Sequence, residues 1–203
     1  MRIEARKPRN SGDAALYESR PEPSLPQVLL TLARRAIERR LTDRPEPIEL
    51  PDIPALQKMG ASFVTLHRDG RLRGCIGSPT AWRSLAEDVT DNAARAAFSD
   101  PRFPPMGADE MFRVKLSLSL LSTPERIRCA DEKDLIGQLR PGIDGLIIED
   151  GDRHALFLPT MWEEISDPEI FLKQLKAKAG LSAQHWSESF RAFRFTAQVH
   201  HEP

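Results

Sequence analysis

The chain has 203 residues, of which 40% are hydrophobic and 29% are charged, a composition that supports a folded core and excludes a wholly disordered chain. Its 29 basic and 30 acidic residues give a net charge of −1, which does not indicate a nucleic-acid-binding protein or one drawn to anionic membranes. The two cysteines cannot form a disulfide framework, and the sequence shows no membrane-length apolar run and no signal peptide, so we expect a soluble cytoplasmic protein with reduced thiols.

Regular structure is expected from residue 25 onward. Residues 1–24 are charged and lack apolar periodicity, which predicts a flexible N-terminal tail. Ser24 is a candidate N-cap, and the helical spacing of the apolar residues that follow predicts a helix that ends near Leu41. We therefore assign residues 25–203 to one domain.

A hairpin, a helix and a strand are expected in the middle of the chain. Residues 61–76 have strand character on both sides of Asp69-Gly70, and such a pair between two strands is a strong hairpin signal. Ser84 begins a candidate capping box, which predicts the start of a helix. Apolar residues then alternate with lysine and serine over residues 114–120, which predicts a half-buried strand.

The same order of elements recurs in the second half of the chain. A second candidate hairpin covers residues 145–158 around Asp150-Gly151. Ser166 is a candidate cap for the helix that follows, and a final strand is predicted over residues 192–199.

A short sequence repeat supports an internal duplication. The pattern Pro-Thr-x-Trp occurs at residues 79–82 and again at residues 159–162. Together with the matching order of elements, it predicts two repeats over approximately residues 60–121 and 144–200. Each repeat has three strands and few long crossovers, so we expect an α+β fold with a mixed or antiparallel sheet. Units this small are expected to share one sheet and one core, with the helices packed outside.

The segment around Cys75 is the densest cluster of unusual residues. Gly74 and Gly77 open the backbone of the strand to close approach by a ligand or another chain. If the hairpin has a two-residue loop, side-chain alternation places Arg71, Arg73 and Cys75 on one face. Two guanidinium groups beside a thiol favour the thiolate, which is the nucleophilic form.

The same register places His67 on the opposite face from Cys75. A Cys–His pair would therefore need His154, His185 or a different register. The segment also fits an inert core cysteine beside solvated arginines, and both interpretations stay open.

No metal site or cofactor site is expected. The histidines have no metal-ligand spacing, and no phosphate-binding loop or nucleophile-elbow motif occurs. Cys129 precedes the acidic segment 131–134, whose charge disfavours a thiolate, so we expect a structural or incidental role for this residue.

Three segments carry a resemblance to a known family. They are Leu-Arg-Gly-Cys-Ile-Gly at residues 72–77, Asp-Pro-Arg-Phe-Pro-Pro at residues 100–105, and Gly-Ile-Asp-Gly-Leu at residues 142–146. They resemble the hallmark sequences of the AMMECR domain family, whose bacterial and archaeal members are called AmmeMemoRadiSam system protein A. The resemblance spans about residues 25–199.

The resemblance implies more about fold and partners than about chemistry. It implies an α+β fold in which duplicated units share a barrel-like sheet, and a cleft that contains residues 73–77. It also implies a pathway shared with a Memo-like protein and a radical S-adenosylmethionine (SAM) enzyme. The activity of the family itself is not established.

Two functions fit these residues. The first is a binding module whose cleft holds a small-molecule or macromolecular ligand. Its candidate ligand-binding residues are Arg71, Arg73, Gly74, Gly77 and Arg102. The alternative is a thiol-dependent enzyme in which Cys75 is the nucleophile or the covalent acceptor of a modification reaction.

Overall fold

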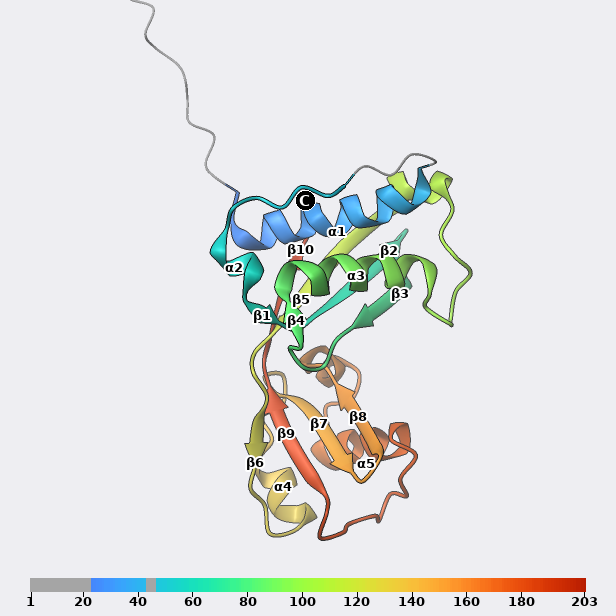
Figure 1. The fold of residues 1–203 in the computed structure, drawn as a ribbon. Coiled ribbons are helices and arrows are strands. Elements are labelled where there is room, and N and C mark those ends of the chain that lie inside the picture. Colours follow the sequence, from blue (N-terminus) through green and yellow to red (C-terminus); the bar gives the residue numbers. More distant parts are fainter. Residues whose placement is uncertain (1–22, 43–46) are drawn as a thin grey trace, which may run out of the picture.

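The computed structural model describes residues 23–42 and 47–203 and divides them between two lobes (Figure 1). The first lobe contains α1 (Leu25–Leu41), α2 (Pro54–Gln57), β1 (Met59–Gly60), β2 (Ser62–Arg68), β3 (Arg71–Gly77), β4 (Arg83–Ser84), α3 (Leu85–Phe98), η1 (Ala108–Arg113), β5 (Val114–Leu121) and β10 (Ala197–His201). The second lobe contains β6 (Glu125–Ile127), α4 (Glu132–Gln138), β7 (Gly145–Asp150), β8 (Arg153–Phe157), η2 (Pro159–Glu163), α5 (Pro168–Lys178) and β9 (Arg191–Phe195). Most of the predicted N-terminal tail, residues 1–22, lies outside the described residues.

Each lobe is built on its own antiparallel four-stranded sheet. The strand order is β10-β5-β2-β3 in the first lobe and β6-β9-β7-β8 in the second, and β1 and β4 form a separate two-stranded sheet. The buried apolar residues accordingly form two clusters, one in each lobe. The expected α+β class and antiparallel pairing are confirmed. The expectation of one shared, barrel-like sheet with one core is wrong, because each four-stranded sheet packs its apolar residues against the helices of its own lobe.

The two lobes exchange strands. β5 continues into β6, which pairs with β9 of the second lobe, and β9 continues into β10, which pairs with β5 of the first lobe. The crossings are joined to each other, since the N–H of Thr196 donates to Ser122 Oγ at 2.9 Å and the N–H of Ser122 donates to the Thr196 carbonyl at 2.9 Å. The exchange gives the sheets matching topologies and ties the lobes together at two points. The boundaries of the two sequence repeats stay a prediction.

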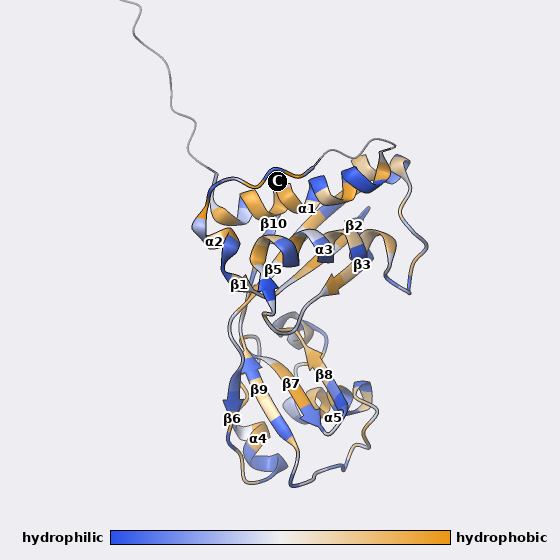
Figure 2. Cartoon of the chain, in the orientation of Figure 1, coloured by the Kyte–Doolittle hydropathy of each residue, from blue (hydrophilic) through white to orange (hydrophobic). Residues whose placement is uncertain are grey.

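Helices cover only one face of the first sheet. The apolar stripe of α1, which includes Leu29, Ala33 and Ile37, is fully buried, and so are Val64 and Leu66 on the face of β2 that looks toward the helices. Figure 2 shows hydrophobic and hydrophilic residues alternating along α1 and α3, as expected of helices that pack on one side. The opposite face of the sheet carries the other residues of β2 and β3. Among the described residues, no helix is long and apolar enough to cross a bilayer.

Local signals located most of the elements, with two corrections. The predicted capping box of Ser84 is present at the start of α3. The helix α5 is capped by Asp167, whose carboxylate accepts from the two N–H groups that follow, so the assignment of its cap to Ser166 is wrong. The strand predicted over 192–199 is two strands, because the chain leaves the second sheet at Thr196 and enters the first.

Candidate functional site

A β-bulge decides which way the side chains of β3 point. Leu66 pairs with Gly74, while the next residue of β2, His67, pairs with Leu72. Arg73 is therefore the extra residue of the bulge. The hairpin loop itself has the predicted two residues, but the bulge shifts the pairing by one position beyond it.

The shift corrects two predictions about the faces of the hairpin. Cys75 pairs with Thr65 and lies on the outward face, which the helices leave uncovered. Arg71 lies on the other face and Arg73 in the bulge, so the prediction that these arginines share a face with Cys75 is wrong. His67 alternates with Thr65 and shares the outward face, so its assignment to the opposite face is also wrong. His67 is thus a candidate base for Cys75, which the register predicted without the bulge had excluded.

The two glycines of the segment face close neighbours within the protein. A Cβ atom on Gly74 would lie 2.1 Å from the carbonyl oxygen of Ala96 in α3. A Cβ atom on Gly77 would lie 2.1 Å from the ring of Phe63. Packing inside the lobe therefore requires glycine at both positions. Their role in ligand binding stays a prediction.

Hydrogen bonds hold Cys75 on both its backbone and its side chain. Its N–H donates to Asp100 Oδ2 at 2.8 Å, and its carbonyl accepts from Arg102 Nη2 at 3.3 Å. The Thr65 hydroxyl donates to Cys75 Sγ at 3.2 Å. The thiol is half-buried on the outward face. These contacts fix both the backbone and the side chain of Cys75.

Asp100 is the buried anchor of this arrangement. It is 3% exposed and accepts two hydrogen bonds from Arg102, from Nε at 3.0 Å and from Nη2 at 2.7 Å. The Arg102 guanidinium and the N–H groups of Cys75 and Arg102 hold the pKa of Asp100 far below its usual range, although burial opposes them. Asp100 is thus charged at neutral pH, and it fixes a cation beside the Cys75 backbone.

Arg73 serves the fold of the first lobe. It is 7% exposed and forms a two-point ion pair with Glu110, at 2.8 and 2.9 Å, and it also donates to the Pro104 carbonyl at 2.9 Å. Arg68 binds the same carboxylate at 2.6 Å. The pair with Arg73, aided by the N–H of Gly107 and by Arg68, lowers the pKa of Glu110 to about 2. The charge of Glu110 is therefore neutralised within the first lobe.

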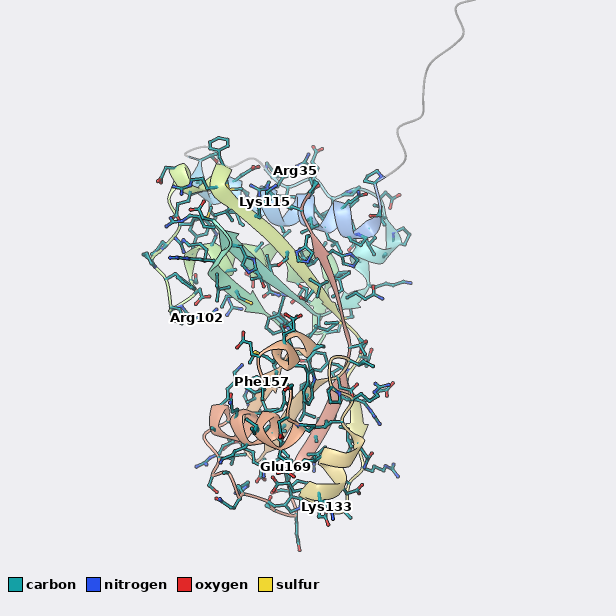
Figure 3. All side chains as sticks on the ribbon, turned by 180° about the vertical axis from the view of Figure 1, so that it is seen from behind. Arg35, Arg102, Lys115, Lys133, Phe157 and Glu169 are labelled. Atoms are coloured by element: carbon teal, nitrogen blue, oxygen red, sulfur yellow. The ribbon has the colours of Figure 1, made fainter. Side chains whose placement is uncertain are left out.

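The second lobe contributes a cation, Lys178, that the sequence did not suggest. Its Nζ donates to the Leu156 carbonyl at 3.0 Å and lies 5.2 Å from the centre of the Phe157 ring. Desolvation and the nearby charge of Arg102 lower the pKa of Lys178, and the Cys75 thiol acts in the opposite direction. In Figure 3, Arg102 lies at the edge of the first lobe that faces the second, and Phe157 lies on the facing part of the second.

A buried polar network fixes the end of β3 to α3. Asp88 is fully buried and accepts from the hydroxyls of Ser62 and Ser78, from Arg83 Nε at 3.0 Å and from Asn92 Nδ2 at 2.9 Å. Ser78 directly follows the segment that carries Cys75. The network therefore sets the path of the chain as it leaves the site.

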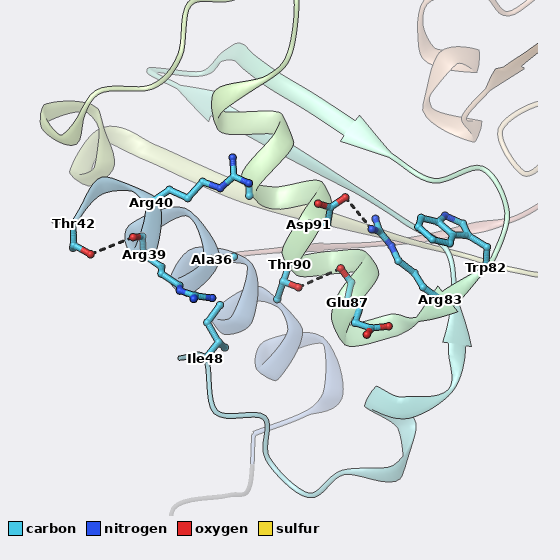
Figure 4. Close-up of a pocket in the computed structure, with 11 residues that line it drawn as sticks. Ala36, Arg39, Arg40, Thr42, Ile48, Trp82, Arg83, Glu87, Thr90 and Asp91 are labelled. Atoms are coloured by element: carbon cyan, nitrogen blue, oxygen red, sulfur yellow. Dashed lines mark hydrogen bonds and ion pairs between the residues drawn. The ribbon is translucent and has the colours of Figure 1, made fainter. Parts of the chain in front are cut away.

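Four surface grooves on the described part of the chain lie elsewhere. Figure 4 shows one of about 830 Å³ between α1 and α3, with Arg39 and Arg40 on one side and Trp82 and Arg83 on the other. Arg83 is paired there with Asp91 at 2.9 Å. Three further grooves, like this one, are lined by residues outside Leu72–Gly77. The outward face of β3 is not part of any of these four grooves.

The described residues contain no candidate metal centre, because no three of their histidine, cysteine or acidic side chains lie close enough together to hold an ion. Cys129 lies in the second lobe, and burial, with the charges of Asp134 and Asp131, raises the pKa of its thiol. This direction agrees with the structural or incidental role predicted for Cys129.

Comparison with known proteins places the chain in a family. The family model AMMECR1 matches residues 30–200. A protein of Methanothermobacter thermautotrophicus is 38% identical over 181 residues, which cover 87% of this chain and 93% of the relative. Protein MJ0810 of Methanocaldococcus jannaschii is 38% identical over 174 residues, covering 84% and 86% of the two chains.

A solved structure has the same fold. The crystal structure of an uncharacterized protein, PH0010, from Pyrococcus horikoshii matches with a TM-score of 0.79 at 38% sequence identity, over 87% of this chain and 91% of that one. These matches cover both lobes and the whole of the site. The chain therefore belongs to the AMMECR1 family, whose activity is uncharacterised.

Proposed function

We propose that this protein is a binding component of a modification pathway, in which the outward face of β3 at Leu72–Gly77 holds a small ligand or a segment of a partner protein. The partners, suggested by the family resemblance, are a Memo-like protein and a radical SAM enzyme. The observation that carries the proposal is the position of Cys75. Cys75 is half-buried on the outward face of the sheet, and its backbone is fixed by the buried carboxylate of Asp100.

The hydrogen bonds of the segment favour binding over acyl transfer at the same cysteine. An acyl-transfer site needs free N–H groups near the nucleophile to stabilise the negative oxygen of the intermediate. The N–H of Cys75 already donates to Asp100, so it is not free for that task. The same bond makes the strand rigid, and a rigid surface loses less entropy when it binds.

One observation favours the alternative of a thiol-dependent enzyme. The Thr65 hydroxyl donates to Cys75 Sγ, and His67 lies on the same face two residues along β2. A hydroxyl donor and a nearby base are the groups that a cysteine nucleophile or covalent acceptor uses. In this form of the proposal, Cys75 is the nucleophile or covalent acceptor and His67 is the candidate base.

Blocking the thiol tests whether this face is the binding surface. In a Cys129→Ser background, iodoacetamide modifies only Cys75. We expect the unmodified protein to bind the purified Memo-like protein or the radical SAM enzyme of the same organism, and the modified protein to bind at least about tenfold more weakly, because the added group occupies the contact face. Titration calorimetry measures both affinities. Equal affinity of the two forms, or no binding by either, contradicts the proposal.

A conservative variant separates the two forms of the proposal. Cys75→Ser keeps the size and polarity of the side chain but removes the nucleophile. Retention of pathway function in cells by Cys75→Ser supports the binding component, whereas its loss together with intact partner binding supports the thiol enzyme.

A further inference from the structure

We propose that the ligand of this site is an anion, and that Arg102 of the first lobe and Lys178 of the second lobe hold it jointly beside Cys75. This inference rests on the proposed function, because it names the chemical class of ligand that the outward face of β3 takes. The class is a carboxylate or phosphate group, on a small molecule or on a partner.

Arg102 is held rigidly and still has hydrogen-bonding capacity. Its Nε and Nη2 atoms are bound to Asp100, and Nη2 also donates to the Cys75 carbonyl. Nη1 has no acceptor among the residues that the structure describes, and the side chain is 53% exposed. A guanidinium fixed by a buried carboxylate offers its remaining nitrogen, Nη1, to an anion at little entropic cost.

Lys178 is the second cation of the proposed site. Its ammonium lies by the Phe157 ring, on the part of the second lobe that faces Arg102 (Figure 3). No carboxylate of the described residues lies within ion-pair distance of Lys178, and one carbonyl oxygen, that of Leu156, accepts one of its three N–H groups. The ammonium also lies 5.2 Å from the centre of the Phe157 ring.

The charges around the site do not cancel. Arg73 and Arg68 share the single negative charge of Glu110, and Arg102 is balanced by Asp100. Lys178 therefore leaves a net positive charge where the lobes face each other. Two cations from different lobes repel each other across the site, and an anion between them replaces this repulsion with two attractions. The lowered pKa of Lys178 agrees with this, since Arg102 contributes to it.

Alkylation by two reagents of different charge tests the inference. Iodoacetate and iodoacetamide both transfer a two-carbon group to sulfur with loss of iodide, and they differ in that only iodoacetate carries a carboxylate. The measured quantity is the ratio of their rates at each cysteine of the native protein at low ionic strength, followed by peptide mass spectrometry and divided by the same ratio in the unfolded chain. We expect a ratio about tenfold above the unfolded reference at Cys75 and no increase at Cys129, which lies beside Asp131 and Asp134.

A lysine variant and its matched control locate the charge. Lys178→Gln should abolish most of the increase at Cys75, while Lys173→Gln, an exposed lysine on the same helix, should leave it unchanged. Added salt should lower the ratio in the wild-type protein, and inorganic phosphate should slow iodoacetate at Cys75 more than sodium chloride of equal ionic strength does.

The outcomes distinguish this inference from the proposed function. If both reagents modify native Cys75 with the unfolded ratio, or if Lys178→Gln leaves the ratio unchanged, the anion site is wrong and the binding face stands. If neither reagent modifies native Cys75, the face is closed and both proposals fall.

Discussion

Replacing Gly74 with alanine should destabilise the folded chain by about 3 kcal/mol or more, the upper end of the range for overpacked sites. The added Cβ atom would lie 2.1 Å from the carbonyl oxygen of Ala96, and neither backbone can move without disturbing the other. Because α3 and β3 are both elements of the first core, relief of this clash requires the helix to separate from the sheet. Urea unfolding at neutral pH measures the change in the free energy of unfolding.

Gly137→Ala is the matched control for this substitution. Gly137 is an exposed glycine in α4, and nothing lies within 4 Å of the Cβ atom that alanine adds there. Since alanine favours helix over glycine, this variant should be stabilised by up to about 1 kcal/mol. A Gly74→Ala protein as stable as the wild type would show that α3 does not touch β3 at this point.

Loss of the Arg73–Glu110 ion pair should cost about as much as other broken buried pairs, roughly 3–5 kcal/mol. The Arg73 and Glu110 side chains are only 8% and 11% exposed. Removing the guanidinium in Arg73→Met therefore leaves the Glu110 carboxylate with one cationic partner, the exposed Arg68. The double variant Arg73→Met/Glu110→Leu should recover part of this loss, because no unpaired charge remains. A single variant within 1 kcal/mol of the wild type in urea unfolding contradicts this account of the pair.

The same carboxylate gives stability a defined dependence on pH. The pKa of Glu110 is lowered from its ordinary value near 4.5 to about 2 in the folded protein, so the unfolded chain binds its proton first as pH falls. Its contribution is therefore complete above about pH 5 and is lost progressively towards pH 2. Glu110→Gln should flatten the pH dependence of stability over this window.

Glu188→Gln, at an exposed position, is the control for the pH experiment. Because this side chain is exposed, the substitution should leave the slope of stability against pH unchanged between about pH 5 and pH 2. Identical slopes for wild type and Glu110→Gln would mean that Glu110 is not held in its charged form by Arg73.

Elements with strong local signals were predictable from the sequence. The capping box at Ser84, the Asp69-Gly70 turn and the strand β5 were each predicted from residues a few positions apart, and all three are present in the structure. The prediction that β5 is half-buried is wrong, because Ser117 and Ser119 on its other face are also buried. The pairing of β6 and β10, which complete the two four-stranded sheets, was not predictable in this way. β6 follows β5 of the first sheet but pairs in the second sheet, and β10 follows β9 of the second sheet but pairs in the first. Nothing in a short window of sequence shows whether a strand pairs in the same sheet as the strand before it.

The site was predicted in its centre and missed in its surroundings. Cys75 and Arg102 were singled out by the sequence, and a hydrogen bond joins them in the structure. The bulge at Arg73 reversed the expected faces, because a single inserted residue leaves the hydrophobic pattern of a short strand almost unchanged. Lys178 lies on the other lobe, so only the three-dimensional arrangement brings its charge to bear on the site.

The accessibility of the Cys75 thiol in the native protein tests the central claim most directly. The measurement is the rate of its reaction with neutral iodoacetamide, compared with the rate in the unfolded chain by peptide mass spectrometry. We predict that native Cys75 reacts within about tenfold of the unfolded rate and faster than Cys129, whose thiol pKa is raised by burial and acidic neighbours. Protection of Cys75 by more than about a thousandfold, with Cys129 the faster of the two, would contradict an outward thiol on β3.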